Sequence, residues 1–125
     1  LGTTGTIMGV GKYLREKNDK VRIVSVEPTP KNTQQGIRNV TTQRTPEIWD
    51  SEAVDERMIS QDEDAYRLAR ALAEKEGVFA GISSGSALWG AIEQAKRLKR
   101  GIVVVVLPDG GEKYLSTSLF DGSSK

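Results

Sequence analysis

Leu1-Gly2-Thr3-Thr4-Gly5-Thr6-Ile7-Met8-Gly9 opens the chain, and this stretch, which runs into a helical pattern, sets the expectation for the fold. Gly2 and Gly5 let the backbone turn tightly and approach a ligand closely. Backbone N–H groups at the start of a helix, aligned with its dipole, form an anion site, and threonine hydroxyls add donors sized for phosphate oxygens. The stretch is therefore either a phosphate-binding loop or a glycine-rich turn that only caps a helix, because a short glycine motif is weakly specific.

The position of this loop at the start of the sequence leads to a second prediction, which concerns the length of the protein. A phosphate loop normally follows a buried strand that places it. Here only Leu1 precedes Gly2, and the sequence has no initiator Met. We therefore expect the chain to be the downstream part of a longer protein, which limits what it can do alone.

The composition narrows the classes of protein to consider. The 125 residues fit one domain, and a net charge of +1 argues against a nucleic-acid-binding module. No apolar run approaches the roughly 20 residues that span a bilayer, so no membrane partner is expected. Because Cys and His are absent, disulfides, the usual zinc and haem ligands, and Ser-His or Cys-His catalysis are excluded. No metal site is expected, and an active site would use carboxylates, Lys, Tyr, Ser or Thr, backbone groups or a cofactor.

Helix and strand patterns alternate in the first half of the chain. Apolar residues at helical spacing predict a helix over residues 6–18. The stripe consists of Ile7, Val10 and Leu14, with Tyr13 beside it. Residues 21–26 and 54–60 have strand character, and together these patterns predict an α/β unit.

Residues 28–57 predict an irregular segment, because they are rich in Pro, Thr, Gln and Asn. A segment of this length in a compact domain is often a lid or a substrate loop. Within it, Gly36 beside Arg38 could form a gate for an anion or a carboxylate. The alternative is that Arg38 is simply solvated.

A strongly predicted helix begins at Ser60. Ser60 and Glu63 match the capping box S-x-x-E, and Gly77 is the expected glycine just beyond the helix end. Its buried stripe is Ala65, Leu68, Ala69, Leu72 and Ala73. We expect this helix to be scaffold.

A second hydroxyl-rich turn, Gly81 to Ala87, opens another helix, with Ser83 or Ser84 as the natural N-cap. The apolar stripe of that helix is Leu88, Ala91, Ile92, Ala95 and Leu98. Two such helix starts in one α/β domain could face one ligand, since ligands lie at the carboxyl ends of the strands.

The β-branched run Ile102 to Leu107 predicts a central parallel strand buried on both faces. It ends in a third glycine-rich turn, Pro108 to Gly111, where Asp109 could cap, bind or form the turn. The order of elements predicts an α/β fold of three layers, with a mainly parallel sheet flanked by helices.

Three segments together resemble a known family. Gly2 to Thr6, Gly81 to Gly85 and Pro108 to Thr117 occur in the order and spacing of the cysteine synthases, pyridoxal-phosphate enzymes of the tryptophan synthase β-like fold. Thr3-Thr4 and Gly36-Ile37-Arg38 look more like the B type than the A type. The resemblance covers residues 1–120, and three motifs in register are far more specific than any one of them.

The resemblance implies a role for each matching position. The loop that holds the 5′-phosphate of pyridoxal phosphate would consist of Gly2, Thr3, Thr4, Gly5 and Thr6. Ser83 would hydrogen-bond the pyridine nitrogen, and Asp109 would lie near the ring, where related enzymes often carry Ser. Gly36 and Arg38 would lie at the substrate entrance and meet an anionic group.

One part of the family's machinery is missing from this sequence. The Schiff-base lysine and the substrate-carboxylate loop lie in the N-terminal half of the family, and no matching motif occurs here. The resemblance thus implies a C-terminal cofactor-binding part, residues 1–120, followed by a disordered tail at residues 121–125, with no catalytic residue of its own. The parent would be a cytoplasmic homodimer that makes L-cysteine by β-replacement on O-acetylserine or a relative with a sulfur donor.

Several alternatives stay open at this point. Another enzyme of the same fold, such as a cystathionine β-synthase or a threonine dehydratase, shares the cofactor. A non-catalytic binding module with a degraded site is a second class. A plain nucleotide-binding domain is a third, although the spacing G-x-G-x-x-G is absent.

Overall fold

The computed structural model describes residues 1–32 and 34–120. Thr33 and the expected disordered tail at residues 121–125 lie outside the described residues. The elements in chain order are α1 (Gly5–Lys17), β1 (Val24–Pro28), the 3-10 helix η1 (Ser51–Ala53), β2 (Glu56–Ser60), α2 (Asp62–Glu76), α3 (Ile82–Arg97) and the 3-10 helix η2 (Gly111–Tyr114).

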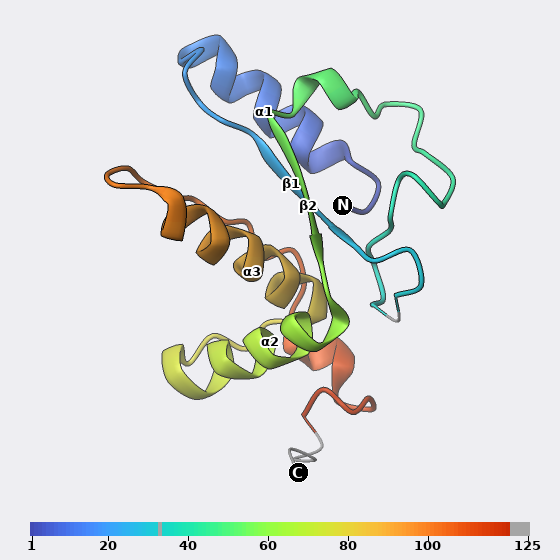
Figure 1. Cartoon of the computed structure of the whole chain (residues 1–125). Helices are drawn as coiled ribbons and strands as arrows, with labels where there is room; N and C mark the ends of the chain where they lie inside the picture. Colours follow the sequence, from blue (N-terminus) through green and yellow to red (C-terminus); the bar gives the residue numbers. More distant parts are fainter. Residues whose placement is uncertain (33, 121–125) are drawn as a thin grey trace.

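Two parallel strands form the middle layer of the molecule. β1 pairs with β2 in a register that runs from Val24 opposite Glu56 to Pro28 opposite Ser60. α1 covers one face of this pair, while α3 and α2 lie on the other (Figure 1). A β-carbon added to Gly11 of α1 would lie 3.5 Å from the side chain of Ile23, and one added to Gly90 of α3 would lie 2.4 Å from Val26. The predicted α/β class, with parallel strands flanked by helices, is confirmed.

A cluster of buried hydrophobic residues lies where α2 meets α3. Its buried members are Ala65, Ala69, Ile82, Tyr114 and Leu119. A β-carbon on Gly85 would lie only 1.9 Å from the carbonyl oxygen of Ala65, so the two helix backbones touch through the missing side chain. The predicted α2 stripe is confirmed at Ala65, Leu68, Ala69 and Leu72. Gly77 ends α2 with φ 67°, as predicted.

The capping box predicted at the start of α2 is wrong. Ser60 is the last residue of β2 and is fully buried, so α2 begins two residues later, at Asp62. The Ser60 hydroxyl donates to the Ser86 hydroxyl at 2.9 Å instead of capping the helix. Gln61 takes the N-cap position without a side-chain hydrogen bond.

The central strand predicted at Ile102 to Leu107 is not formed within the described residues. Ile102 is 91% exposed and Val104 is 85% exposed, although both are β-branched. A strand requires a hydrogen-bonded neighbour, and in the part of the chain described here β1 and β2 pair only with each other. The apolar run therefore has the composition of a strand, but no strand of the described residues pairs with it.

The predicted apolar stripes of the two other helices are also largely uncovered. Val10, Tyr13 and Leu14 of α1 are 45%, 59% and 38% exposed. α3 buries its small and polar face in place of Leu88, Ala91, Ile92, Ala95 and Leu98. The face that it buries comprises Ile82, Ser83, Ser84, Gly85, Ser86, Gly90 and Gln94. This face is buried because its small residues, such as Gly85 and Gly90, let the backbones of α2 and β1 approach α3 closely.

Residues 29–50 carry no helix or strand among the described residues, which agrees with the irregular segment expected over residues 28–57. η1 closes this segment, and its N-cap, Asp50, accepts a hydrogen bond from the backbone of Glu52. Over the described ranges, no helix has the length and apolar character needed to cross a membrane.

Candidate functional site

The N-terminal loop turns into α1 at Thr4, whose backbone is unusual. Thr4 is the N-cap of α1 and has φ 67° and ψ −6°, the left-handed conformation. For a β-branched residue this conformation costs about 1–2 kcal/mol. Such outliers gather at ligand-binding sites, where surrounding structure holds them in place.

The side chain of Thr4 supports a polar ligand. Thr4 is only 4% exposed, and its hydroxyl oxygen Oγ1 is buried without a hydrogen-bond partner among residues 1–32 and 34–120. It caps no backbone N–H of α1, so the simple capping interpretation fails for this side chain. An unpartnered buried hydroxyl costs about 1–3 kcal/mol. Placed at the start of a 13-residue helix, it fits an anion that would supply the missing partner.

The structure brings this loop and the predicted substrate segment together. The backbone N–H of Arg38 donates to the carbonyl of Leu1 at 2.7 Å. A β-carbon on Gly2 would lie 2.9 Å from the carbonyl oxygen of Gly36, which itself has φ 81°. Glycine at position 2 therefore allows the two backbones to lie side by side, and glycine at position 36 permits the positive φ. The guanidinium of Arg38 donates to the carbonyl of Arg44 at 3.4 Å in an exposed contact, so both interpretations of Arg38 stay open.

Asp109 and the start of α3 form a second tight cluster. The carboxylate of Asp109 accepts hydrogen bonds from the backbone N–H of Ser83 at 3.2 Å and of Ser84 at 2.9 Å. It also accepts from the Ser84 hydroxyl at 2.5 Å and from the Tyr114 hydroxyl at 2.7 Å. Asp109 therefore caps α3 from a distant turn, and the expectation that Ser83 or Ser84 is the N-cap is wrong, since Gly81 holds that position.

These hydrogen bonds fix the charge of the cluster. Burial alone would raise the pKa of the Asp109 carboxyl, but hydrogen bonds from Ser84, Tyr114 and Ser83 outweigh it and hold the pKa below its usual range. Burial and the Asp109 carboxylate together raise the pKa of the Tyr114 hydroxyl. Asp109 is thus an anion engaged by its own chain, and nothing in this geometry turns its carboxylate outward.

Ser83 lies against the same carboxylate as its neighbour. Ser84 donates both its backbone N–H and its hydroxyl to Asp109, and Ser83 donates its backbone N–H at 3.2 Å. Ser83 is 7% exposed and lies in the first turn of α3. The contact of the Ser83 hydroxyl to a ring nitrogen stays a prediction.

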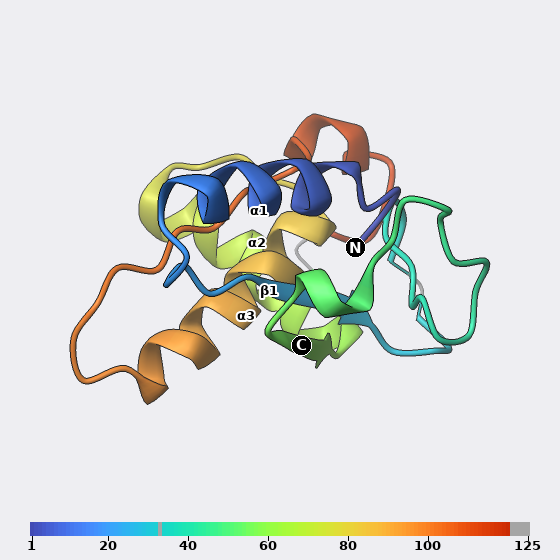
Figure 2. The same cartoon turned by 90° about the horizontal axis from the view of Figure 1, so that it is seen from above.

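The clusters share one side of the molecule. The N-terminal loop, the start of α3 and the carboxyl ends of both strands lie toward the same side in two perpendicular views (Figures 1 and 2). This is the edge at which parallel α/β sheets bind ligands. The hydroxyl-rich loops therefore stand where a common ligand could reach them.

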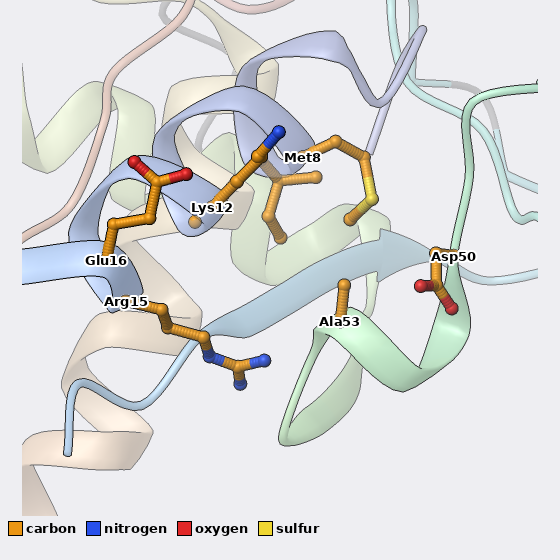
Figure 3. A pocket seen from close by; sticks show the side chains of 8 residues that line it. Met8, Lys12, Arg15, Glu16, Asp50 and Ala53 are labelled. Atoms are coloured by element: carbon orange, nitrogen blue, oxygen red, sulfur yellow. The ribbon is translucent and has the colours of Figure 1, made fainter. Parts of the chain in front are cut away.

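A separate hollow of about 610 Å³ lies between α1 and η1 (Figure 3). It is lined by apolar residues such as Ile7 and Met8 and by charged residues such as Lys12 and Asp50. None of the predicted site residues lines it. Over the described ranges, no group of three acidic residues could hold a metal ion.

Sequence reasoning missed the polar side chains beneath the loops. Gln34, which is 4% exposed, accepts from the Ser86 hydroxyl and donates to the Asp62 carboxylate at 2.9 Å. Glu27 is fully buried and pairs with Arg57. The only sequence signal was the position of Glu27 at the end of a strand, and nothing in the pattern pointed to Arg57.

Comparisons with known proteins bear on this geometry. A family model described as "Pyridoxal-phosphate dependent enzyme" matches residues 1–109. A cysteine synthase of Aquifex aeolicus is 42% identical over 125 aligned residues, which are 96% of this chain and 38% of that protein. Cysteine synthase B of Escherichia coli is 41% identical over 120 residues, with 96% and 40% covered. The crystal structure of a cysteine synthase from Entamoeba histolytica, 31% identical, superposes with a TM-score of 0.88 over all of this chain and 40% of that one.

Proposed function

Because the chain belongs to the family of pyridoxal-phosphate-dependent enzymes, we propose that it is the part of a cysteine synthase that holds the cofactor's phosphate and pyridine ends. It spans about 40% of the length of the curated relatives that it matches. The whole protein would act on a small amino-acid substrate, O-acetylserine or a relative, together with a sulfur donor, and release L-cysteine. The homodimeric state and the cytoplasmic location stay predictions.

The unpartnered hydroxyl of Thr4 carries this proposal. It is a buried donor at the positive end of α1, so an anion bound there gains both a hydrogen bond and the helix dipole. A phosphate group fits this chemistry, with the loop Gly2 to Thr6 supplying backbone N–H groups. Thr3 and Thr6 are exposed, and their hydroxyls are available to the same ligand.

The remaining site residues would bind the cofactor ring, position Ser83 and attract the substrate. The bound cofactor supplies the electron sink for β-replacement. The neutral hydroxyl of Ser83 would hold the ring without forcing a proton onto its nitrogen. Asp109 orients Ser83, because it holds the backbone N–H groups of Ser83 and Ser84. Arg38 would attract an anionic substrate toward the loop.

The isolated chain is expected to have negligible synthase activity. No lysine in it lies in the context that the resemblance associates with the covalent cofactor link. The measurement is cysteine formation from O-acetylserine and sulfide by the 125-residue chain with pyridoxal phosphate. Clear turnover would show that another residue of this chain does that work and would overturn the assignment.

A chimera supplies the positive test. Residues 1–120 replace the matching segment of the Aquifex aeolicus cysteine synthase, whose remaining part stays unchanged. We expect the purified chimera to bind pyridoxal phosphate, with its visible absorbance band, and to form cysteine. A folded chimera that binds the cofactor but does not turn over O-acetylserine would favour a different substrate, such as that of a dehydratase. A folded chimera without cofactor would contradict the proposal.

A further inference from the structure

The irregular segment that follows β1 is held at three consecutive residues. Near its middle, the Arg38 N–H donates to the Leu1 carbonyl beside the N-terminal loop. At the next residue, the side-chain amide of Asn39 donates to the carbonyl of Pro28 at 3.0 Å. Arg38 and Asn39 are consecutive residues, so the backbone that carries Arg38 is fixed immediately on both sides.

A third contact, one residue further on, depends on a buried charge. Glu27, the penultimate residue of β1, is fully buried, and one of its carboxylate oxygens accepts the backbone N–H of Val40 at 3.0 Å. This N–H is also buried, since Val40 is 6% exposed. A carboxylate removed from water in this way requires a cation and further hydrogen bonds.

Arg57 of β2 provides that cation with a two-point contact. Its Nε atom lies 2.7 Å from one oxygen of Glu27, and a terminal nitrogen lies 3.2 Å from the other. The same terminal nitrogen donates to the hydroxyl of Thr41 at 3.0 Å, and the guanidinium lies 6.0 Å from the centre of the Trp49 ring. Arg57 therefore touches β1 and two separate points of the irregular segment.

We propose that Arg57 is a positioning residue for the substrate segment, because it holds Glu27 and Thr41 and thereby fixes where Gly36 and Arg38 lie. The contacts of Arg57 are to Glu27, Thr41 and Trp49, so we assign it an indirect role through these partners. The inference rests on the proposed function for the role of Arg38, but the anchoring contacts stand apart from that role.

The geometry explains why arginine is required. Only a planar guanidinium offers two parallel N–H donors to one carboxylate and a further donor to a hydroxyl. Lysine would keep the positive charge but would lose the pair of parallel N–H donors. We therefore expect Arg57→Lys to retain part of the effect and Arg57→Met to lose all of it.

The functional experiment uses the chimera with the Aquifex aeolicus enzyme. In Arg57→Met we expect KM for O-acetylserine to rise about tenfold, while kcat and the cofactor absorbance band stay near those of the unmodified chimera. Arg57→Lys should give a smaller rise. Because Arg57→Met leaves a buried carboxylate unpaired, the double variant Glu27→Gln/Arg57→Met serves as a second test that removes the unpaired charge.

Arg97→Met is the matched control. Arg97 also pairs with a carboxylate of β2, Glu56 at 2.6 Å, but none of its hydrogen bonds reaches the irregular segment. It should leave KM unchanged. Equal KM values for Arg57→Met, the double variant and the control would overturn the inference, as would a fall in kcat with KM unchanged.

A second readout is independent of catalysis. Hydrogen exchange of the Val40 amide should be at least about tenfold faster in Arg57→Met than in Arg97→Met, while the amides of α2 stay unchanged. Unchanged exchange at Val40 would overturn the anchoring itself. An inactive chimera with accelerated exchange would contradict the proposed function and leave the anchor supported, so the two failures are distinguishable.

Discussion

Replacing Asp109 by Ala tests the account of how α3 begins. The change removes four hydrogen bonds to one carboxylate, those from the Ser83 and Ser84 backbone and from the Ser84 and Tyr114 hydroxyls. Loss of a helix cap costs about 1–2 kcal/mol, and a hydrogen bond to a charged group contributes about 1.5–3 kcal/mol. Because bonds to one group are not additive, we expect the free energy of unfolding to fall by about 3 kcal/mol in total.

The assay is urea unfolding at pH 7, followed by circular dichroism. The matched control is Glu112→Ala, because Glu112 is an exposed neighbouring carboxylate for which no hydrogen bond to the described residues is found. It should change the free energy of unfolding by less than about 0.5 kcal/mol. A loss below about 1 kcal/mol for Asp109→Ala would refute the claim that this carboxylate caps α3.

The same carboxylate predicts a pH dependence. The pKa of the Asp109 carboxyl lies below its ordinary value in the folded state, so the folded state binds its proton less readily than the unfolded chain does. The stabilisation is therefore fully present above the unfolded pKa and is lost as the pH falls through the folded one. Wild-type protein should lose more stability below about pH 4 than Asp109→Ala does. Parallel acid curves for the two proteins would contradict this.

Three glycine substitutions separate close packing from backbone conformation. Gly85→Ala should destabilise by about 3 kcal/mol, because the new β-carbon would lie 1.9 Å from the backbone oxygen of Ala65. Gly9→Ala is its counterpart on an exposed helix face, with nothing within 4 Å, and should stabilise by about 1 kcal/mol. Gly77→Ala should cost about 1 kcal/mol, since φ is 67° there although the space is open. Thermal unfolding ranks all three, and any order other than Gly85 most harmful and Gly9 harmless would contradict the packing.

Local chemistry predicted the features that depend on nearby residues. The glycine at the end of α2 and the stripe of α2 follow from helix periodicity and from the freedom of Gly77 to adopt a positive φ. The loop before α1 was predicted as an anion site, and the structure adds the unpartnered hydroxyl of Thr4. The structure places Gly36 and Arg38 beside Gly2 and Leu1, while their position at a substrate entrance, implied by the resemblance, stays a prediction.

The sequence predictions that were wrong concern residues whose partners lie far along the chain. Asp109 caps a helix 25 residues away, which no local pattern encodes. Ser60 was predicted to cap α2, but it is the last residue of β2 and its hydroxyl donates to Ser86. The run Ile102 to Leu107 has the composition of a central strand, yet pairing requires a neighbour that the described residues do not supply. A pattern predicts the conformation that a segment favours, whereas burial depends on what surrounds it.

Thr4 offers the most direct test of the phosphate loop. Isothermal titration would compare pyridoxine 5′-phosphate with pyridoxine, which lacks the phosphate. Neither has the aldehyde that reacts with surface lysines. We expect wild-type chain to bind the phosphorylated compound at least about tenfold more tightly, and Thr4→Val to lose most of that preference while its free energy of unfolding rises by about 1 kcal/mol. Equal affinity of the wild-type chain for the two compounds would contradict the assignment of this loop to the cofactor phosphate.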